Sequence, residues 1–228
     1  MYRYEASSVT GFVQQLAVGY VQHGHHFYVA GSIPDNKNIE AVDKKLIELY
    51  GVNVSKWARA RARASGEASV QYLRHGRYFV LIATKGRHLF FERESQVQDI
   101  RRKPLRYAGY SISYRQGADR KWHASVRIAG DEYLRMKSFF VGLAAHRSVD
   151  NLSLPLSCVP FEPYAPVRRQ LLNILRAVNR TRKAAGYDLV PSSVLRLRRR
   201  IVKPFIEDGA GIFGIEKWQV EESGGFAR

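Results

Sequence analysis

Three histidines near the start of the sequence are the residues best suited to chemistry. His23, His25 and His26 lie within the run HGHHF. Imidazole changes its charge near neutral pH and is a common ligand of divalent metals, so this group could hold a metal ion or transfer protons. Tyr133 and Lys137 follow much later, about one helical turn apart. These residues suggest a phosphodiester-cleaving enzyme with His23, His25 and Tyr133 as catalytic residues. A polar loop entering a strand and a core tyrosine would explain the same residues without catalysis.

The order of these features resembles that of the HUH single-strand nucleases: a helix, a histidine cluster, a strand, and later a helix that carries a tyrosine. The resemblance implies that paired histidines hold a divalent metal and that Tyr133 attacks a phosphate. Gly24 stands where that family has a bulky apolar residue. His25 and His26 are adjacent, so on a strand they point to opposite faces. A divalent metal is expected only on this hypothesis, and otherwise we expect neither a metal site nor a cofactor.

A metal-independent endoribonuclease is the second enzymatic hypothesis. Such an enzyme needs a general acid or base, together with a cation that stabilises the negative charge of the transition state. Two parts of the sequence offer this pairing: His123 near Arg127, and His75 near Arg74 and Arg77. The sequence alone does not choose between them.

A group of arginines in residues 166–204 is better suited to binding than to catalysis. Apolar residues in the first half recur at the i, i+3, i+4 spacing of a buried helical face. A second helix is predicted over residues 192–203, because Ser192 or Ser193 can cap it and Pro191 cannot lie inside it. Its expected buried stripe is Val194, Leu197 and Ile201. The cations expected on the outward faces are Arg169, Arg176, Arg180 and Lys183 on the first helix and Arg196, Arg199, Arg200 and Lys203 on the second.

A basic face of this kind favours nucleic acid as the partner. Arg and Lys release condensed counterions when they neutralise a phosphate backbone, and helix-turn-helix proteins place a second helix in the major groove. A solvated charged face packed on the rest of the protein is the alternative. The protein could act alone or as a subunit of a ribonucleoprotein, or of a mobile-element or antiviral defence complex. Other subunits would then be additional partners.

Aromatic and basic residues also alternate elsewhere in the sequence. A short helix, KWARARARA, is predicted at residues 56–64, and an exposed basic loop at residues 101–103. Bases stack on aromatic rings while arginine contacts the phosphates, so these segments suit RNA or single-stranded DNA. The residues predicted to make these contacts are Lys56, Trp57, Arg59, Arg63, Arg101 and Arg102.

The composition supports a polyanionic partner. Lys and Arg number 37 against 20 Asp and Glu, which gives a formal net charge of +17 over 228 residues, and such a field attracts polyanions. The single cysteine, Cys158, excludes an internal disulfide. No apolar run is long enough to span a bilayer and no secretory leader pattern is visible, so we expect a cytoplasmic protein without a membrane partner.

The elements that must position these residues indicate an α+β fold with a mostly antiparallel sheet flanked by helices, followed by a basic helical region. Residues 110–115 and 122–128 alternate apolar and polar side chains across a turn, as in a β-hairpin. The predicted division is an α+β domain over residues 1–150, a Pro-rich connector over 151–166, a basic helical pair over 167–207, and a Gly-rich tail over 208–228.

Overall fold

The computed structural model describes residues 2–117, 119–146 and 148–205, so the predicted Gly-rich tail lies outside the described residues. Its first sheet has four strands in the order β2 (Val70–His75), β3 (Tyr78–Ala83), β1 (Phe27–Ser32) and β4 (Gln98–Asp99). Every neighbouring pair in it is antiparallel. The central strand β3 carries the continuous apolar run that a strand buried on both faces requires.

A second antiparallel sheet contains β5 (Leu105–Tyr107), β6 (Tyr110–Gln116) and β7 (Trp122–Ile128). The predicted hairpin is confirmed as β6 and β7. Along β7, Val126 and Ile128 are buried while Arg127 between them is exposed. One face of this sheet therefore joins the core, and the other carries polar side chains.

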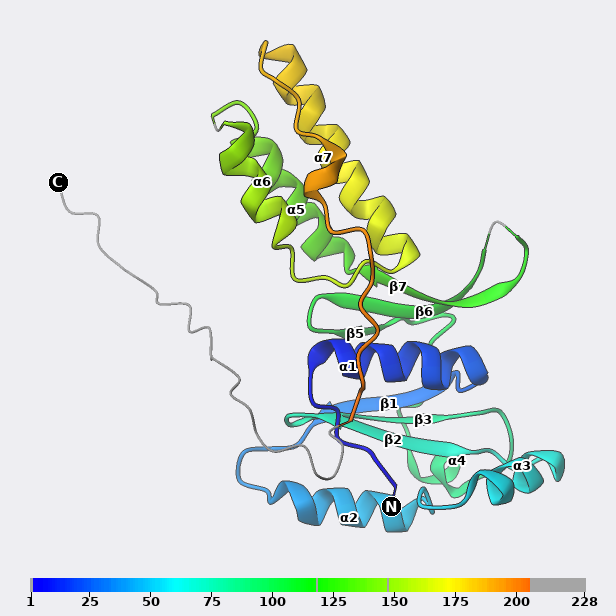
Figure 1. The fold of residues 1–228 in the computed structure, drawn as a ribbon. Helices are drawn as coiled ribbons and strands as arrows, with labels where there is room; N and C mark the ends of the chain where they lie inside the picture. Colours follow the sequence, from blue (N-terminus) through cyan, green and yellow to red (C-terminus); the bar gives the residue numbers. More distant parts are fainter. Residues whose placement is uncertain (1, 118, 147, 206–228) are drawn as a thin grey trace.

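The first helix lies between the two sheets (Figure 1). It runs as α1 (Val9–Gln14), a π-helical turn (Gln15–Tyr20) and a 3₁₀ turn (Val21–His23). Its buried residues recur every four positions: Phe12, Leu16 and Tyr20, and Val13, Ala17 and Val21. A four-residue repeat drifts around an α-helix by about 40° per step. The wider π turn keeps these residues facing the two sheets.

Three helices lie below the first sheet in Figure 1: α2 (Ile39–Leu49), α3 (Lys56–Ala64) and α4 (Leu89–Arg93). Helices α2 and α4 contribute to a small core that includes Tyr72 and Phe90. The helix predicted at residues 56–64 is confirmed as α3, where Ser55 accepts a hydrogen bond from the Ala58 amide as the N-cap.

Above the second sheet lie α5 (Gly130–Leu143), α6 (Val149–Ser157) and α7 (Ala165–Ala184). Helix α7 packs on α5 and on β7. Helix α6 occupies the first half of the predicted connector. A helix can form there because Ser148 caps it and Pro155 falls only in its last turn. The main core cluster includes residues from Ala6 to Leu195, so side chains on both sides of the predicted connector share it.

The second helix predicted over residues 192–203 is wrong. Only Ser192–Val194 form a 3₁₀ turn, and Ile201, expected on the buried stripe, is 81% exposed. The segment instead passes alongside α1 as an extended chain, which we call the C-terminal strap (residues 190–205) (Figure 1). Its backbone finds hydrogen-bond partners in other elements. Gln14 Nε2 donates to the Val202 carbonyl at 2.6 Å, and the Val202 amide donates back to Gln14 Oε1 at 3.3 Å.

The fold is α+β, with two antiparallel sheets and helices around them, as the sequence predicts. Among the described residues, no helix combines the length and apolar character that crossing a bilayer requires.

Candidate nucleic-acid interface

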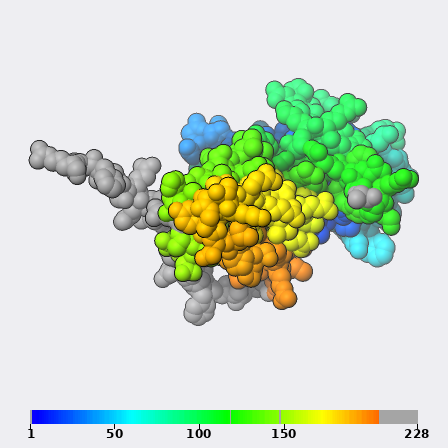
Figure 2. Space-filling model, turned by 90° about the horizontal axis from the view of Figure 1, so that it is seen from above, coloured from blue at the N-terminus to red at the C-terminus, as the bar shows by residue number. Residues whose placement is uncertain are grey.

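The outward face of α7 carries the predicted row of cations. Arg169, Arg176, Arg180 and Lys183 are all exposed, while the residues that alternate with them at helical spacing are buried against the core. Figure 2 looks down on this side of the molecule, where α7 (yellow to orange) is uncovered. In the described part of the chain, none of the four forms an ion pair with a carboxylate. The row is therefore exposed positive charge that no carboxylate of residues 2–117, 119–146 and 148–205 neutralises.

The cations of the strap do not continue this row as a helical face. Arg196 pairs with the buried Glu162 at 2.9 Å. The guanidinium of Arg199 lies over the ring of Tyr164, 4.8 Å from its centroid, and the backbone amide of Arg200 also donates to Glu162. Lys203 is exposed near the end of the strap. Arg196 and Arg199 therefore hold the strap to the body of the protein.

Helix α3 presents a separate basic and aromatic surface. Trp57 is 78% exposed, and Lys56 and Arg63 are exposed on the same helix. Arg59 is turned back, since its Nη1 donates to the Val54 carbonyl at 2.7 Å. No residue of α3 is fully buried. An exposed tryptophan among arginines leaves a ring face open for stacking.

The basic loop after β4 is partly neutralised. Arg101 makes a bidentate ion pair with Asp99, with its Nη2 2.7 Å from the carboxylate. Hydrogen bonding from Arg101 lowers the pKa of Asp99, and the same guanidinium lies 5.5 Å from the centroid of the Phe27 ring. Arg102 is exposed next to it. Of the two predicted contacts, Arg102 is the one without a carboxylate partner among the described residues.

The predicted histidine cluster is divided between different surroundings. His23 is exposed, whereas His25 is 7% exposed and packs on Tyr20. Burial lowers the pKa of His25 to about 4. His26 contacts Tyr114 instead, with 4.4 Å between the centroids of the tilted rings. Tyr133 lies on α5, partly buried against the core. Within the described ranges, no group of three His, Cys, Asp or Glu side chains is placed to hold a metal ion.

The residues considered for metal-independent cleavage are mostly engaged in structural contacts. Arg74 is buried between Asp43, 3.0 Å away, and Glu5, 2.8 Å away. Arg77 pairs with Asp35. His75 Nδ1 lies 2.6 Å from the Tyr107 hydroxyl. These contacts stabilise the first sheet and its neighbours.

The other pairing, His123 with Arg127, is on the second sheet. His123 Nε2 lies 2.9 Å from an Asp119 carboxylate oxygen in the hairpin loop. Arg127 lies with Arg115 on the polar face of β6 and β7, a pairing that our reading of the sequence missed. The available signal is a repeated Ser-x-Arg pattern, Ser113 to Arg115 and Ser125 to Arg127, which the hairpin register places side by side.

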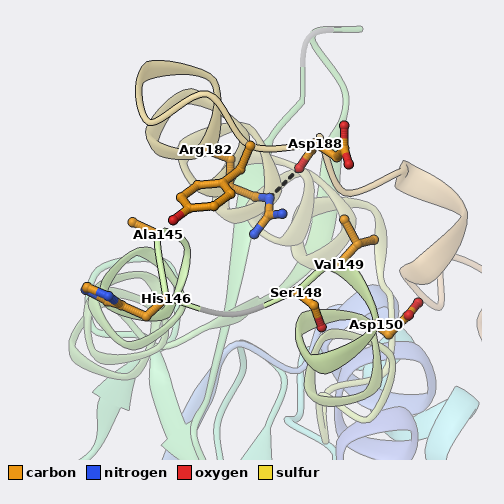
Figure 3. A pocket seen from close by; sticks show the side chains of 8 residues that line it. Ala145, His146, Ser148, Val149, Asp150, Arg182 and Asp188 are labelled. Carbon is orange, nitrogen blue, oxygen red and sulfur yellow. Dashed lines mark hydrogen bonds between the residues drawn. The ribbon is translucent and has the colours of Figure 1, made fainter.

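A cavity of about 710 Å³ opens between the end of α5, the start of α6 and the loop after α7 (Figure 3). Arg182 is buried at its edge. Its Nε donates to the Asp188 carbonyl and its Nη1 donates to the Ala144 carbonyl at 2.9 Å. These contacts fasten the end of α5 to the loop after α7. The arginine here has a structural role.

Scans against protein-family models, curated proteins and solved structures find no match to this chain.

Proposed function

We propose that the protein binds nucleic acid and contacts the phosphate backbone along the outward face of α7. The observation that carries the proposal is the row formed by Arg169, Arg176, Arg180 and Lys183, exposed on one side of the helix and without carboxylate partners in the part of the chain that the structure describes. The formal net charge of +17 supports the same class of partner.

The dimensions of the row suit a phosphate backbone. Arg169 and Lys183 are fourteen positions apart in the sequence, which is about 21 Å along a helix. One strand of B-form duplex places about six phosphates over that length. Each cation can therefore meet its own phosphate and release its own counterions, which makes binding depend strongly on salt.

The exposed surface of α3 supports a second contact. Trp57 offers an open ring on a helix that also exposes Lys56 and Arg63. Stacking of a base on such a ring contributes about 1–3 kcal/mol and does not depend on sequence. A single strand or an RNA loop could use this contact. The protein could make it as a subunit of a ribonucleoprotein, a mobile-element complex or a defence complex.

The test is the salt dependence of binding to labelled duplex and single-stranded RNA and DNA. A variant with Arg176→Gln, Arg180→Gln and Lys183→Gln removes three of the proposed phosphate contacts. The slope of log K against log salt should become shallower by about 2–3 units, and the weakening should be similar for all sequences.

The matched control also removes three cations, but ones that already have carboxylate partners. Arg77→Gln, Arg106→Gln and Arg135→Gln break the pairs with Asp35, Asp131 and Glu132. This control should keep the wild-type slope. An equal change of slope in both triple variants would mean that net charge alone, rather than the face of α7, governs binding.

A further inference from the structure

The polar face of the β6–β7 hairpin directs two arginines toward one pair of serines. Ser113 and Ser125 are direct cross-strand partners, 2% and 8% exposed. Arg115 Nε donates to Ser113 Oγ at 3.0 Å, and Arg127 Nε donates to Ser125 Oγ at 3.4 Å. Because the strands are antiparallel, each arginine reaches back over its own strand, and the two approach the serine pair from opposite ends.

A third arginine adds its charge from α7. Partial desolvation lowers the pKa of Arg127, and the positive charges of Arg115 and Arg169 lower it further. Among the described residues, no carboxylate forms an ion pair with any of the three. Three cations held near one another repel, and an anion placed between them would replace that repulsion with attraction.

We propose that this serine pair and the three arginines form a seat for one phosphate group of the bound nucleic acid. Each serine holds an arginine through its Nε, which orients the guanidinium. Over the described residues, the Nη groups of Arg115 and Arg127 have no hydrogen-bond partner. Guanidinium groups with free Nη donors match the oxygens of a phosphate.

The seat extends the proposed function, on which it rests, because it gives the bound strand a fixed point. Arg169 belongs both to the seat and to the row on α7, and α7 packs on β7. Figure 2 shows the hairpin (green) beside α7 (yellow) on the same side of the molecule. A strand held at the serine pair can continue along α7 toward Lys183.

The first experiment compares two single substitutions in the same hairpin. Arg127→Gln removes a cation of the seat, whereas Arg120→Gln removes an exposed cation from the loop. With a labelled strand, Arg127→Gln should make the salt slope shallower by about 0.7–0.9 units, the value for one phosphate contact. Arg120→Gln should leave the slope unchanged. Equal slopes for the two variants, with the wild-type protein binding the strand, overturn the seat and leave the proposed function standing.

The second experiment uses inorganic phosphate alone, at constant ionic strength against chloride. A ligand that binds the folded state raises the melting temperature. Phosphate should raise that of the wild-type protein and of Arg120→Gln, and raise that of Arg127→Gln or of the Ser113→Ala, Ser125→Ala double variant much less. The serine variant keeps every charge, so an equal rise in it shows that phosphate responds to net charge and overturns the seat. Absence of binding to any labelled strand by the wild-type protein overturns the proposed function itself.

Discussion

Burial determines the charge of His25. Its ring packs on Tyr20, and its Nδ1 lies 3.2 Å from the Tyr20 carbonyl. Burial lowers its pKa to about 4, so the ring is neutral at physiological pH. The group binds fewer protons in the folded state than in the unfolded state between pH 4 and 6.5. The neutral ring therefore contributes stability that is present above pH 6.5 and is lost as the pH falls through about 4.

The expected loss can be measured by chemical denaturation between pH 7 and pH 4. His25 should account for about 3 kcal/mol of the fall in the free energy of unfolding. His25→Phe, which cannot titrate, should make the fall smaller by about that amount. The exposed His23→Gln should show the wild-type profile. Identical profiles for His25→Phe and the wild-type protein would show that another group controls acid unfolding.

At the scale of elements, the C-terminal strap is held to the first helix by hydrogen bonds between the Gln14 side chain and the strap backbone. Gln14→Ala removes both hydrogen bonds to Val202. Hydrogen exchange of the Val202 amide should accelerate by about tenfold or more, since each lost hydrogen bond is worth about 1 kcal/mol.

A second glutamine of the same helical run provides the control. Gln22 Oε1 accepts from the Ala124 amide of β7 at 2.9 Å. Gln22→Ala should accelerate exchange at Ala124 and leave Val202 protected. Faster exchange at Val202 in both variants would indicate a general loosening of the first helix rather than release of the strap.

The strap also shows where reading the sequence fails. Helix α7 is predictable because its apolar residues recur at helical spacing, and its outward cations follow from that spacing. In the strap, similar spacing led to a wrong prediction. On a helix Arg196 would face Arg199 and Arg200 at the i, i+3 and i, i+4 spacings, where like charges repel. The backbone instead bonds to Gln14 and Glu162, which are distant in sequence. Partners of that kind are invisible before the fold is known.

The candidate site likewise contains residues that the sequence predicts and residues that only the tertiary structure brings together. The row on α7 follows from local spacing alone, and Trp57 is predicted as a contact from its position among basic residues. The seat on the hairpin needs the pairing of Ser113 with Ser125 and the placement of α7 against β7, which are tertiary facts. The packing of His25 on Tyr20 of the first helical run and the contact of His26 with Tyr114 of β6 likewise depend on how the folded elements are arranged. Residue types suggested a catalytic cluster there, whereas their surroundings are those of packed side chains.

At the scale of the whole molecule, one helix supplies the core between the two sheets. Phe12 is fully buried and its ring contacts both Tyr78 of β3 and Tyr107 of β5. Phe12→Ala should lower the free energy of unfolding by about 3–5 kcal/mol. Hydrogen exchange should accelerate by the same factor in β3 and in β6, because both sheets lose the same support.

Val18→Ala is the matched control, since Val18 lies in the same helical run but is largely exposed. It should change exchange in neither sheet measurably. Acceleration confined to one sheet in Phe12→Ala would show that the two halves unfold independently, with the helix belonging to only one of them.

The position of this helix also has a consequence for synthesis on the ribosome. The two apolar sides of the helix, at residues 9–23, are translated before β7. Strand β7, which covers one of these sides, ends only at Ile128. About a hundred residues must be translated in between, which takes about 5–20 seconds at ordinary rates. During that interval the nascent chain exposes an apolar helical face that the second sheet does not yet cover. Chaperones that recognise such segments have time to bind it until the later strands have been translated.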